Sequence, residues 1–270
     1  MYLWRRRVNS ASLSAEELFA LAPGRVAITQ VHGQRRAVVE VCCRTKNEVR
    51  EWQRRLGGRS ERLAAGWEKK YLAAARLAPL RIGRRLRVVS DAGGGLPNEL
   101  VIPAAGAFGT GEHATTAMCL RLLEEVSRGR SLGWRMLDVG TGTGILALAA
   151  RRLGAVAALG LDNDPRAVAH ARANARMNKI GAVKFVRQDF LRWKPEARFD
   201  FVAANLFSEL LIAAVPVFRR SLGTNGRLIL SGILRAQADE VIQQFSRCGF
   251  ALLEIRRRGK WVALLLARKS

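Results

Sequence analysis

The chain has 270 residues, which is enough for one large domain or for a large domain and a small one. It is 49% hydrophobic and 25% charged, as globular proteins are, and its formal net charge is +24. No apolar stretch is long enough to cross a bilayer, and the arginines at 5–7 are not followed by the apolar core of a signal peptide. We therefore expect a cytoplasmic protein without a membrane partner.

Positive charge is densest in the first third of the chain, where residues 1–90 hold 20 Lys and Arg but only 7 Asp and Glu. Such an excess favours an acidic partner, such as RNA, a ribonucleoprotein or an acidic protein. A general preference for arginine on a solvated surface explains it equally well. The four cysteines include no C-x-x-C pair, so they indicate neither a zinc site nor a disulfide framework.

Residues 1–58 alternate quickly between short elements. The order strand, helix, strand, strand, helix, with a possible closing strand, predicts a small ferredoxin-like α+β domain. Serine or threonine followed three residues later by glutamate begins both helices, at Ser14 and Thr45. The expected strands are Tyr2–Val8, Val26–Val31 and Ala37–Cys43, and the expected helices are Ala15–Ala22 and Asn47–Leu56.

Residues 59–100 are expected to link this domain to the next. We predict a helix over Ser60–Ala75, with Ser60 as its N-cap. Arg85–Val89 and Glu99–Ile102 then predict a strand pair, joined through the glycine-rich stretch 91–97.

Residues 101–270 show the regular alternation of a doubly wound α/β fold. Five apolar strands separated by helical stretches predict a mostly parallel sheet, and a final antiparallel hairpin brings it to seven strands. The strands are expected at Arg135–Val139, Val156–Leu161, Val183–Arg187, Phe199–Asn205, Arg227–Ser231, Ala251–Arg256 and Trp261–Ala267. The helices are expected at Thr115–Val126, Gly144–Leu153, Pro165–Met177, Ser208–Leu222 and Ala236–Cys248.

The stretch LDVGTGTG, residues 137–144, follows a strand and opens a helix, as glycine loops that bind nucleotides do. A dinucleotide loop with glycine at Gly140 and Gly142 would need a third glycine at 145, which is Ile145. Asp138 lies just before the loop, where a carboxylate would repel a pyrophosphate but would suit a ligand carrying an ammonium and a sulfonium. The loop thus favours S-adenosylmethionine over a dinucleotide.

Polar residues at three further strand ends point toward the same edge of the sheet. Asp162 follows Gly140 by 22 residues and can accept both ribose hydroxyls. Asp189 is a candidate for the adenine amino group, although a turn aspartate is the ordinary alternative. Asn205 can accept a hydrogen bond from an amine that is being methylated. The ordinary alternative is an asparagine that only stabilises the turn at the end of the strand.

The most specific stretch is AFGTGEHATT, residues 107–116. Together with the glycine loop, GLDNDP (160–165), ANLFSEL (204–210) and LSGIL (230–234), it resembles the PrmA family, whose members methylate amino groups of ribosomal protein L11. The resemblance covers the chain from about residue 60 to 261. It implies the fold of S-adenosylmethionine-dependent methyltransferases, with a small N-terminal domain that docks the protein substrate.

Carried over by position, the resemblance implies that Thr116, Gly140, Asp162 and Asn205 contact the cofactor or border its methyl group. Gly142 belongs to the same loop, and Phe108 begins a segment that would close over the cofactor as a lid. Glu112 and Ala114 depart from the residues frequent in that lid. The implied activity is methyl transfer from S-adenosylmethionine to lysine or N-terminal amino groups of a protein, most simply a ribosomal protein, with Asn205 as the catalytic residue.

Three other functions remain open from the sequence. The positive charge, concentrated in the N-terminal segment, is compatible with RNA contact and with an RNA N-methyltransferase. The Asn-Pro-Pro-aromatic motif of adenine methyltransferases is absent, however, since Leu206, Phe207 and Ser208 follow Asn205. A non-catalytic binding protein with this fold is the second alternative. A small-molecule methyltransferase is the third.

Overall fold

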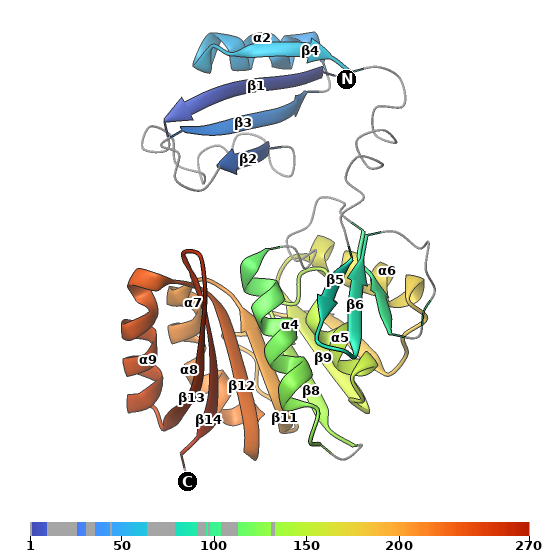
Figure 1. Cartoon of the computed structure of the whole chain (residues 1–270), viewed down its shortest axis with the longest axis vertical. Coiled ribbons are helices and arrows are strands. Elements are labelled where there is room, and N and C mark those ends of the chain that lie inside the picture. Colours follow the sequence, from blue (N-terminus) through green and yellow to red (C-terminus); the bar gives the residue numbers. More distant parts are fainter. Residues whose placement is uncertain are drawn as a thin grey trace. The chain divides into compact units, whose positions relative to one another are not determined.

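The computed structural model describes residues 2–9, 26–30, 36–43, 45–63, 79–90, 96, 98–103, 113–130 and 133–269. The chain forms two compact units, residues 1–75 and 76–270 (Figure 1). The predicted helix at Ala15–Ala22, its capping box at Ser14, and Phe108 lie outside the described residues. No helix among the described residues is long and apolar enough to cross a membrane.

The first unit is a four-stranded antiparallel sheet with one described helix. Its strands are β1 (Tyr2–Asn9), β2 (Val26–Gln30), β3 (Arg36–Cys43) and β4 (Arg59–Arg62), in the spatial order β2-β3-β1-β4. Helix α2 (Lys46–Leu56) begins at the predicted cap, where Thr45 Oγ1 accepts a hydrogen bond from the Glu48 amide at 3.2 Å. Trp4 and Trp52 stack at the centre of its small core with ring centroids 5.2 Å apart.

The predicted helix over Ser60–Ala75 is wrong at its beginning, and its remainder, residues 64–75, lies outside the described residues. Residues Arg59–Arg62 form β4, which pairs antiparallel with β1 from Tyr2↔Arg62 to Arg5↔Arg59. Pairing with a strand distant in sequence outweighs the local helical pattern and the apparent N-cap. The first unit therefore continues past residue 58, where the sequence suggested a boundary.

The second unit opens with a small three-stranded sheet of β5 (Leu80–Ile82), β6 (Leu86–Val89) and β7 (Glu99–Val101). The sequence suggested only the last two strands, and these two pair in parallel. Arg85 joins this sheet to the larger fold, because its guanidinium donates to the Leu153 carbonyl at 2.6 Å and to Ser127 Oγ at 3.1 Å.

A seven-stranded sheet forms the body of the second unit, in the order β10-β9-β8-β11-β12-β14-β13. All neighbours are parallel except where β14 pairs antiparallel with β12 and β13. This is the mostly parallel, doubly wound sheet that the sequence predicted. Its strands are β8 (Arg135–Val139), β9 (Ala157–Asp162), β10 (Val183–Arg187), β11 (Phe199–Asn205), β12 (Leu222–Leu234), β13 (Phe250–Arg258) and β14 (Trp261–Arg268).

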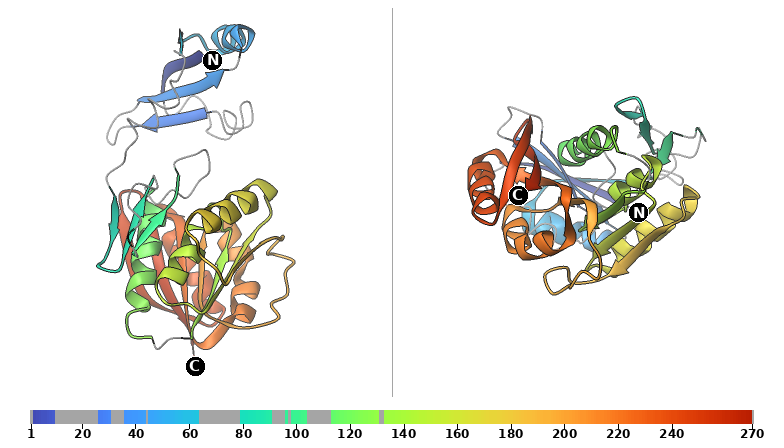
Figure 2. Two further views of the ribbon diagram at one scale, coloured as in Figure 1. Left: turned by 90° about the vertical axis from the view of Figure 1, so that its right-hand side faces the viewer. Right: turned by 90° about the horizontal axis from the view of Figure 1, so that it is seen from below.

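Helices cover both faces of this sheet (Figures 1 and 2). On one face lie α4 (Ala114–Val126), α5 (Ile145–Arg152) and α6 (Pro165–Met177). On the other lie α7 (Ser208–Ala213), α8 (Val215–Ser221) and α9 (Ala238–Arg247), which follows the short turn η1 (Arg235–Gln237). The predicted single helix over 208–222 is thus two, and Pro216 lies in the first turn of the second.

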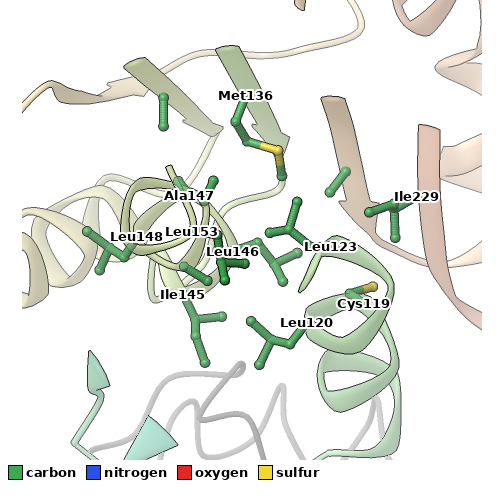
Figure 3. Packing of buried hydrophobic residues seen from close by; sticks show 14 of the residues in the cluster. Cys119, Leu120, Leu123, Met136, Ile145, Leu146, Ala147, Leu148, Leu153 and Ile229 are labelled. Atoms are coloured by element: carbon green, nitrogen blue, oxygen red, sulfur yellow. The ribbon is translucent and has the colours of Figure 1, made fainter. Parts of the chain in front are cut away.

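The two faces have separate cores because successive strand residues point to opposite sides. In β11, Phe201 and Ala203 pack with α4 and α5, whereas Val202 and Ala204 pack with α7, α8 and α9. Figure 3 shows the first of these cores, in which Leu120 and Leu123 of α4 meet Ile145 and Leu146 of α5 beneath the sheet. A tightly packed layer of this kind holds the strand ends in fixed positions.

Candidate functional site

The candidate site lies at the carboxyl edge of the seven-stranded sheet. The strand order changes direction between β8 and β11, and in open α/β sheets ligands bind at such a switch point beyond the strand ends. The glycine loop follows β8, Asp162 ends β9 and Asn205 ends β11, so all three lie at this edge.

The glycine loop has the backbone conformation that only glycine adopts easily. Gly140, Gly142 and Gly144 have φ of +70°, +54° and +81°. The amides of Gly140 and Thr141 both donate to the Leu161 carbonyl at 2.9 Å, which fastens the loop to β9. Gly144 then serves as the N-cap of α5 without a side chain of its own.

Asp162 holds the loop as well as facing the edge. Its Oδ2 accepts a hydrogen bond from the Gly142 amide at 2.9 Å, and its Oδ1 accepts one from the Asp164 amide at 3.0 Å. An ionised carboxylate has about four acceptor sites, so each oxygen keeps capacity for a further donor. The N-cap of α6 is Asp164, which accepts from the Arg166 amide at 2.8 Å and leaves Asp162 available for another role.

Asp138 is buried beneath the loop rather than directed into the site. Its Oδ2 accepts from Thr141 Oγ1 at 2.6 Å and from the Ala147 amide at 3.2 Å, so it supplies the carboxylate cap that Gly144 cannot give to α5. Burial raises the pKa of Asp138 to about 6, against the lowering effect of these two hydrogen bonds. The residue therefore shapes the loop, and the prediction that its carboxylate faces the ligand is wrong.

Asn205 is joined to helix α4 across the site. Its Nδ2 donates to Oγ1 of Thr116 at 3.2 Å, and Thr116 is 1% exposed in the first turn of that helix. The other amide atom, Oδ1, is buried and has no hydrogen-bond partner among the described residues. Such an atom is uncommon in a native structure, because an unpaired buried acceptor costs about 1–3 kcal/mol.

Leu206 packs between the glycine loop and β12, a contact that the sequence did not suggest. A Cβ at Gly140 would lie 2.5 Å from Leu206 Cδ2, and one at Gly232 would lie 2.3 Å from the Leu206 carbonyl oxygen. The Leu206 amide donates to the Ser231 carbonyl at 3.0 Å. Gly140 and Gly232 thus make room for the turn that follows Asn205, and an apolar residue such as Leu206 carries no sequence signal for this role.

His113 lies at the start of α4, next to the described part of the site. Its Nδ1 is 2.7 Å from Thr115 Oγ1, and its ring meets Trp261 edge to face at 5.0 Å. Burial, and then the charge of Lys260, lower the pKa of His113, so the imidazole is favoured in its neutral form. These contacts tie the first turn of α4 to the hairpin of β13 and β14.

Asp189 follows β10 and forms a turn. Its Oδ1 accepts from the Leu191 amide at 3.1 Å, and its carboxylate lies 3.5 Å from Arg192 Nε. The side chain is 50% exposed, so the carboxylate remains accessible at the same edge. The structure therefore brings together Gly140, Gly142 and Asp162, and separately Thr116 and Asn205; these five lie with Asp189 along one edge.

Comparison with known proteins decides the family. The model of the family described as "Ribosomal protein L11 methyltransferase (PrmA)" matches residues 11–269 of the chain. The chain belongs to the PrmA family. The match spans both compact units, although the sequence motifs that suggested it lie only in the second.

Individual relatives agree with this assignment. The chain is 44% identical over 161 residues to a protein of Desulforapulum autotrophicum named ribosomal protein L11 methyltransferase, covering 59% of this chain and 52% of that one. It is 38% identical over 222 residues to a protein of the same name from Pelobacter propionicus, covering 78% and 68%. The chain thus spans about half to two thirds of the length of these curated relatives.

A solved structure shares the fold. The crystal structure titled as a ribosomal protein L11 methylase from Lactobacillus delbrueckii subsp. bulgaricus superposes with a TM-score of 0.63 at 28% identity. The match covers 71% of this chain and 99% of that one. The seven-stranded sheet with its final antiparallel hairpin is therefore the methyltransferase fold of this family.

Proposed function

We propose that this chain is an S-adenosylmethionine-dependent protein N-methyltransferase. It transfers methyl groups to lysine or N-terminal amino groups of a protein substrate, and the names of its relatives support ribosomal protein L11 as that substrate. The observation that carries the proposal is Asn205 Oδ1, a buried acceptor left without a partner among the described residues at the edge where the glycine loop lies.

The residues at this edge fit the cofactor. Asp162 keeps two unused acceptor sites for ribose hydroxyls, and Gly140 and Gly142 leave the loop backbone without side chains. Asp189, exposed after β10, is the candidate for the adenine amino group, and Phe108 for the lid. When bound, S-adenosylmethionine supplies a methyl group on a positively charged sulfur, which is the hard part of the chemistry.

The chain's own residues then act on the acceptor amine. A protonated lysine has a pKa near 10.4 and no free lone pair, so the amine must lose a proton before it attacks. Asn205 Oδ1 can accept a hydrogen bond from the neutral amine and direct its lone pair toward the methyl carbon. The hydrogen bond from Nδ2 to Thr116 fixes the orientation of the amide and leaves Oδ1, the acceptor, without a partner among the described residues.

We further infer that the first unit is a ferredoxin-like domain that recognises the substrate. Its antiparallel order β2-β3-β1-β4, with α2 between β3 and β4, supports this topology. Arg6 and Arg7 of β1 are exposed and form no ion pair among the described residues, which supports an additional RNA contact there. On this proposal the second unit carries the catalysis, and the enzyme works in the cytoplasm, where ribosomal proteins are made.

Replacement of Asn205 by alanine tests the proposal. Losing one hydrogen bond that aligns the amine should lower kcat about 10–100-fold, which corresponds to about 1.5–3 kcal/mol. The dissociation constant of S-adenosylmethionine should stay within about twofold, since the backbone loop and Asp162 remain. Asn225→Ala, in an exposed stretch at the other end of β12, is the matched control. An unchanged kcat in Asn205→Ala would remove Asn205 from the reaction.

A further inference from the structure

The hairpin of β13 and β14 ends in a cluster of cations at the carboxyl edge of the sheet. Both β12 and β13 pair antiparallel with β14, so they run parallel and end at the same edge as Asn205. Arg257, Arg258 and Lys260 are exposed at the end of the hairpin, and the amide of Arg235 donates to the Lys260 carbonyl at 2.9 Å. These four residues are called the basic tip below.

The basic tip has few acids beside it that are free to pair with it. Glu125 and Glu254 both pair with Arg256, and Asp239 and Glu240, which follow Arg235 in the first turn of α9, form no ion pair with the basic tip. None of the four cations forms an ion pair with a described residue, and Lys260 instead lies 5.2 Å from the centre of the Trp261 ring. Exposed arginines in a tight turn, without acids to neutralise them, create a local positive potential.

The basic tip and the carboxylates that follow β9 and β10 lie on opposite sides of Asn205 along this edge. Of those carboxylates, Asp164 and Asp189 pair with Arg166 and Arg192, whereas the cations of the basic tip, at the ends of β12 and β13, form no ion pair with a described residue. The cofactor is assigned to the side of the carboxylates. The acceptor amine therefore reaches Asn205 from the side of the basic tip. The positive charge of the basic tip then favours substrates with acidic residues next to that amine.

The strand registers give the span from Asn205 to the basic tip. Asn205 pairs with Ser231 of β12, and Leu234, three residues later, pairs with Trp261 of β14. Two strand spacings make ~10 Å across the sheet and three residues make ~10 Å along it, so the span to the start of β14, beside Lys260, is ~14 Å. Arg258 lies one spacing further, on β13, so its span is ~17 Å. An extended chain covers these distances in about four to five residues.

Exposed apolar residues at the same edge indicate a protein partner rather than a nucleic acid. Phe207, two residues after Asn205, is 69% exposed, and Leu210 and Leu234 are 38% and 36% exposed. An apolar centre with a charged rim is typical of protein–protein interfaces, whereas nucleic-acid interfaces are more polar.

We propose that the basic tip binds acidic residues of the protein substrate about four positions from the amine that is methylated. An arginine guanidinium binds a carboxylate through two parallel hydrogen bonds, which gives direction as well as attraction. This inference rests on the proposed function, because it takes Asn205 as the place of the acceptor amine. It adds a sequence preference, acidic residues flanking the target, that the family assignment does not contain.

Peptide binding to the full-length protein tests the proposal. Two fluorescent 15-residue peptides carry one central lysine, with glutamate four positions away on each side in the first and glutamine in the second. Arg257→Gln/Arg258→Gln should raise the Kd of the glutamate peptide at least fivefold. The control, Arg219→Gln/Arg220→Gln, removes the same charge from the exposed end of α8, at the opposite edge of the sheet, and should bind like the unaltered protein.

The glutamine peptide should bind weakly and equally to all three proteins, and added salt should reduce the preference for glutamate. Equal affinity of the tip variant and its control for the glutamate peptide would overturn the proposal. So would a loss of affinity for a labelled 15-nucleotide RNA without a loss for the peptide. Binding needs no methyl transfer, so charge-dependent binding without methylation would refute the proposed function and leave the basic tip as a docking surface.

Discussion

Gly232 offers a quantitative test of how the acceptor side of the site is built. It lies in β12 where the register with β14 shifts, with φ of +85°, and the chain after Asn205 crosses directly over it. A methyl group added there would lie 2.3 Å from the carbonyl oxygen and 3.0 Å from the amide nitrogen of Leu206. Backbone atoms cannot move aside as a flexible side chain can, so Gly232→Ala must displace the turn that holds Asn205.

The loss of stability in Gly232→Ala has two parts, which a matched control variant separates. A non-glycine residue at positive φ costs about 1–2 kcal/mol, and overpacking against fixed atoms adds about 1–3 kcal/mol. Gly249 has nearly the same φ, +83°, but a Cβ there would meet nothing nearer than 4.0 Å. We therefore expect Gly249→Ala to lower the free energy of unfolding by about 1–2 kcal/mol and Gly232→Ala by about 2–5 kcal/mol.

Urea unfolding followed by tryptophan fluorescence measures both values, and methyl transfer measures the consequence for the site. Gly232→Ala should lower kcat at least tenfold relative to Gly249→Ala, because the Asn205 amide moves with the displaced turn. Equal stability losses in the two variants would show that Leu206 does not press on Gly232. Equal kcat values would show that the turn does not position Asn205.

Three further predictions address other parts of the molecule. Asp162→Asn should raise the Kd for S-adenosylmethionine at least tenfold in calorimetry, through lost charge-assisted hydrogen bonds, and an unchanged Kd would contradict the ribose assignment. Trp4→Ala should lower the free energy of unfolding of the first unit by about 3–5 kcal/mol, because Trp4 is fully buried and its Nε1 donates to the Gly57 carbonyl at 2.8 Å. Limited proteolysis should then cut residues 1–75 while cofactor binding persists; loss of that binding would contradict the independence of the units. The pKa of Asp138, about 6 in the folded protein, lies above its unfolded value, so its contribution to stability is lost as pH rises through about 6. As the pH rises from 4 to 7, the free energy of unfolding of Asp138→Asn should therefore increase relative to that of the unaltered protein by up to about 3 kcal/mol, as measured by denaturant titration. If the two free energies of unfolding changed in parallel with pH, Asp138 would not have the raised pKa.

The parts of the fold that the sequence predicted correctly are those with strong local signals. Helix α6 begins and ends where expected, at Pro165 and Met177, because Asp164 caps it and proline fixes its first turn. Residues 59–62 were predicted wrongly because their partner, β1, is more than fifty residues away. The short strand β5, Leu80–Ile82, gave no pattern of its own, since three residues show no periodicity.

The candidate site also contains contacts that the sequence predicts and contacts that it does not. Gly142 and Asp162 follow adjacent parallel strands, so their meeting could be inferred from spacing alone. The role of Asp138 as a cap for α5 could not, because the direction of its side chain depends on packing beneath the loop. Nor could the packing of Leu206 between two glycines that lie 92 residues apart in the chain, Gly140 and Gly232. Contacts between distant segments need the folded structure.

The identity of the methyl acceptor is the most direct test of the whole account. The purified full-length protein would be incubated with radiolabelled S-adenosylmethionine, ribosomal protein L11 and ribosomal RNA, with and without RNase, and label would be followed separately into protein and RNA. We expect RNase-resistant label on amino groups of the protein, located by mass spectrometry, and the loss of that label in Asn205→Ala. Label in RNA alone, or no transfer to L11 by a protein that binds S-adenosylmethionine, would contradict it.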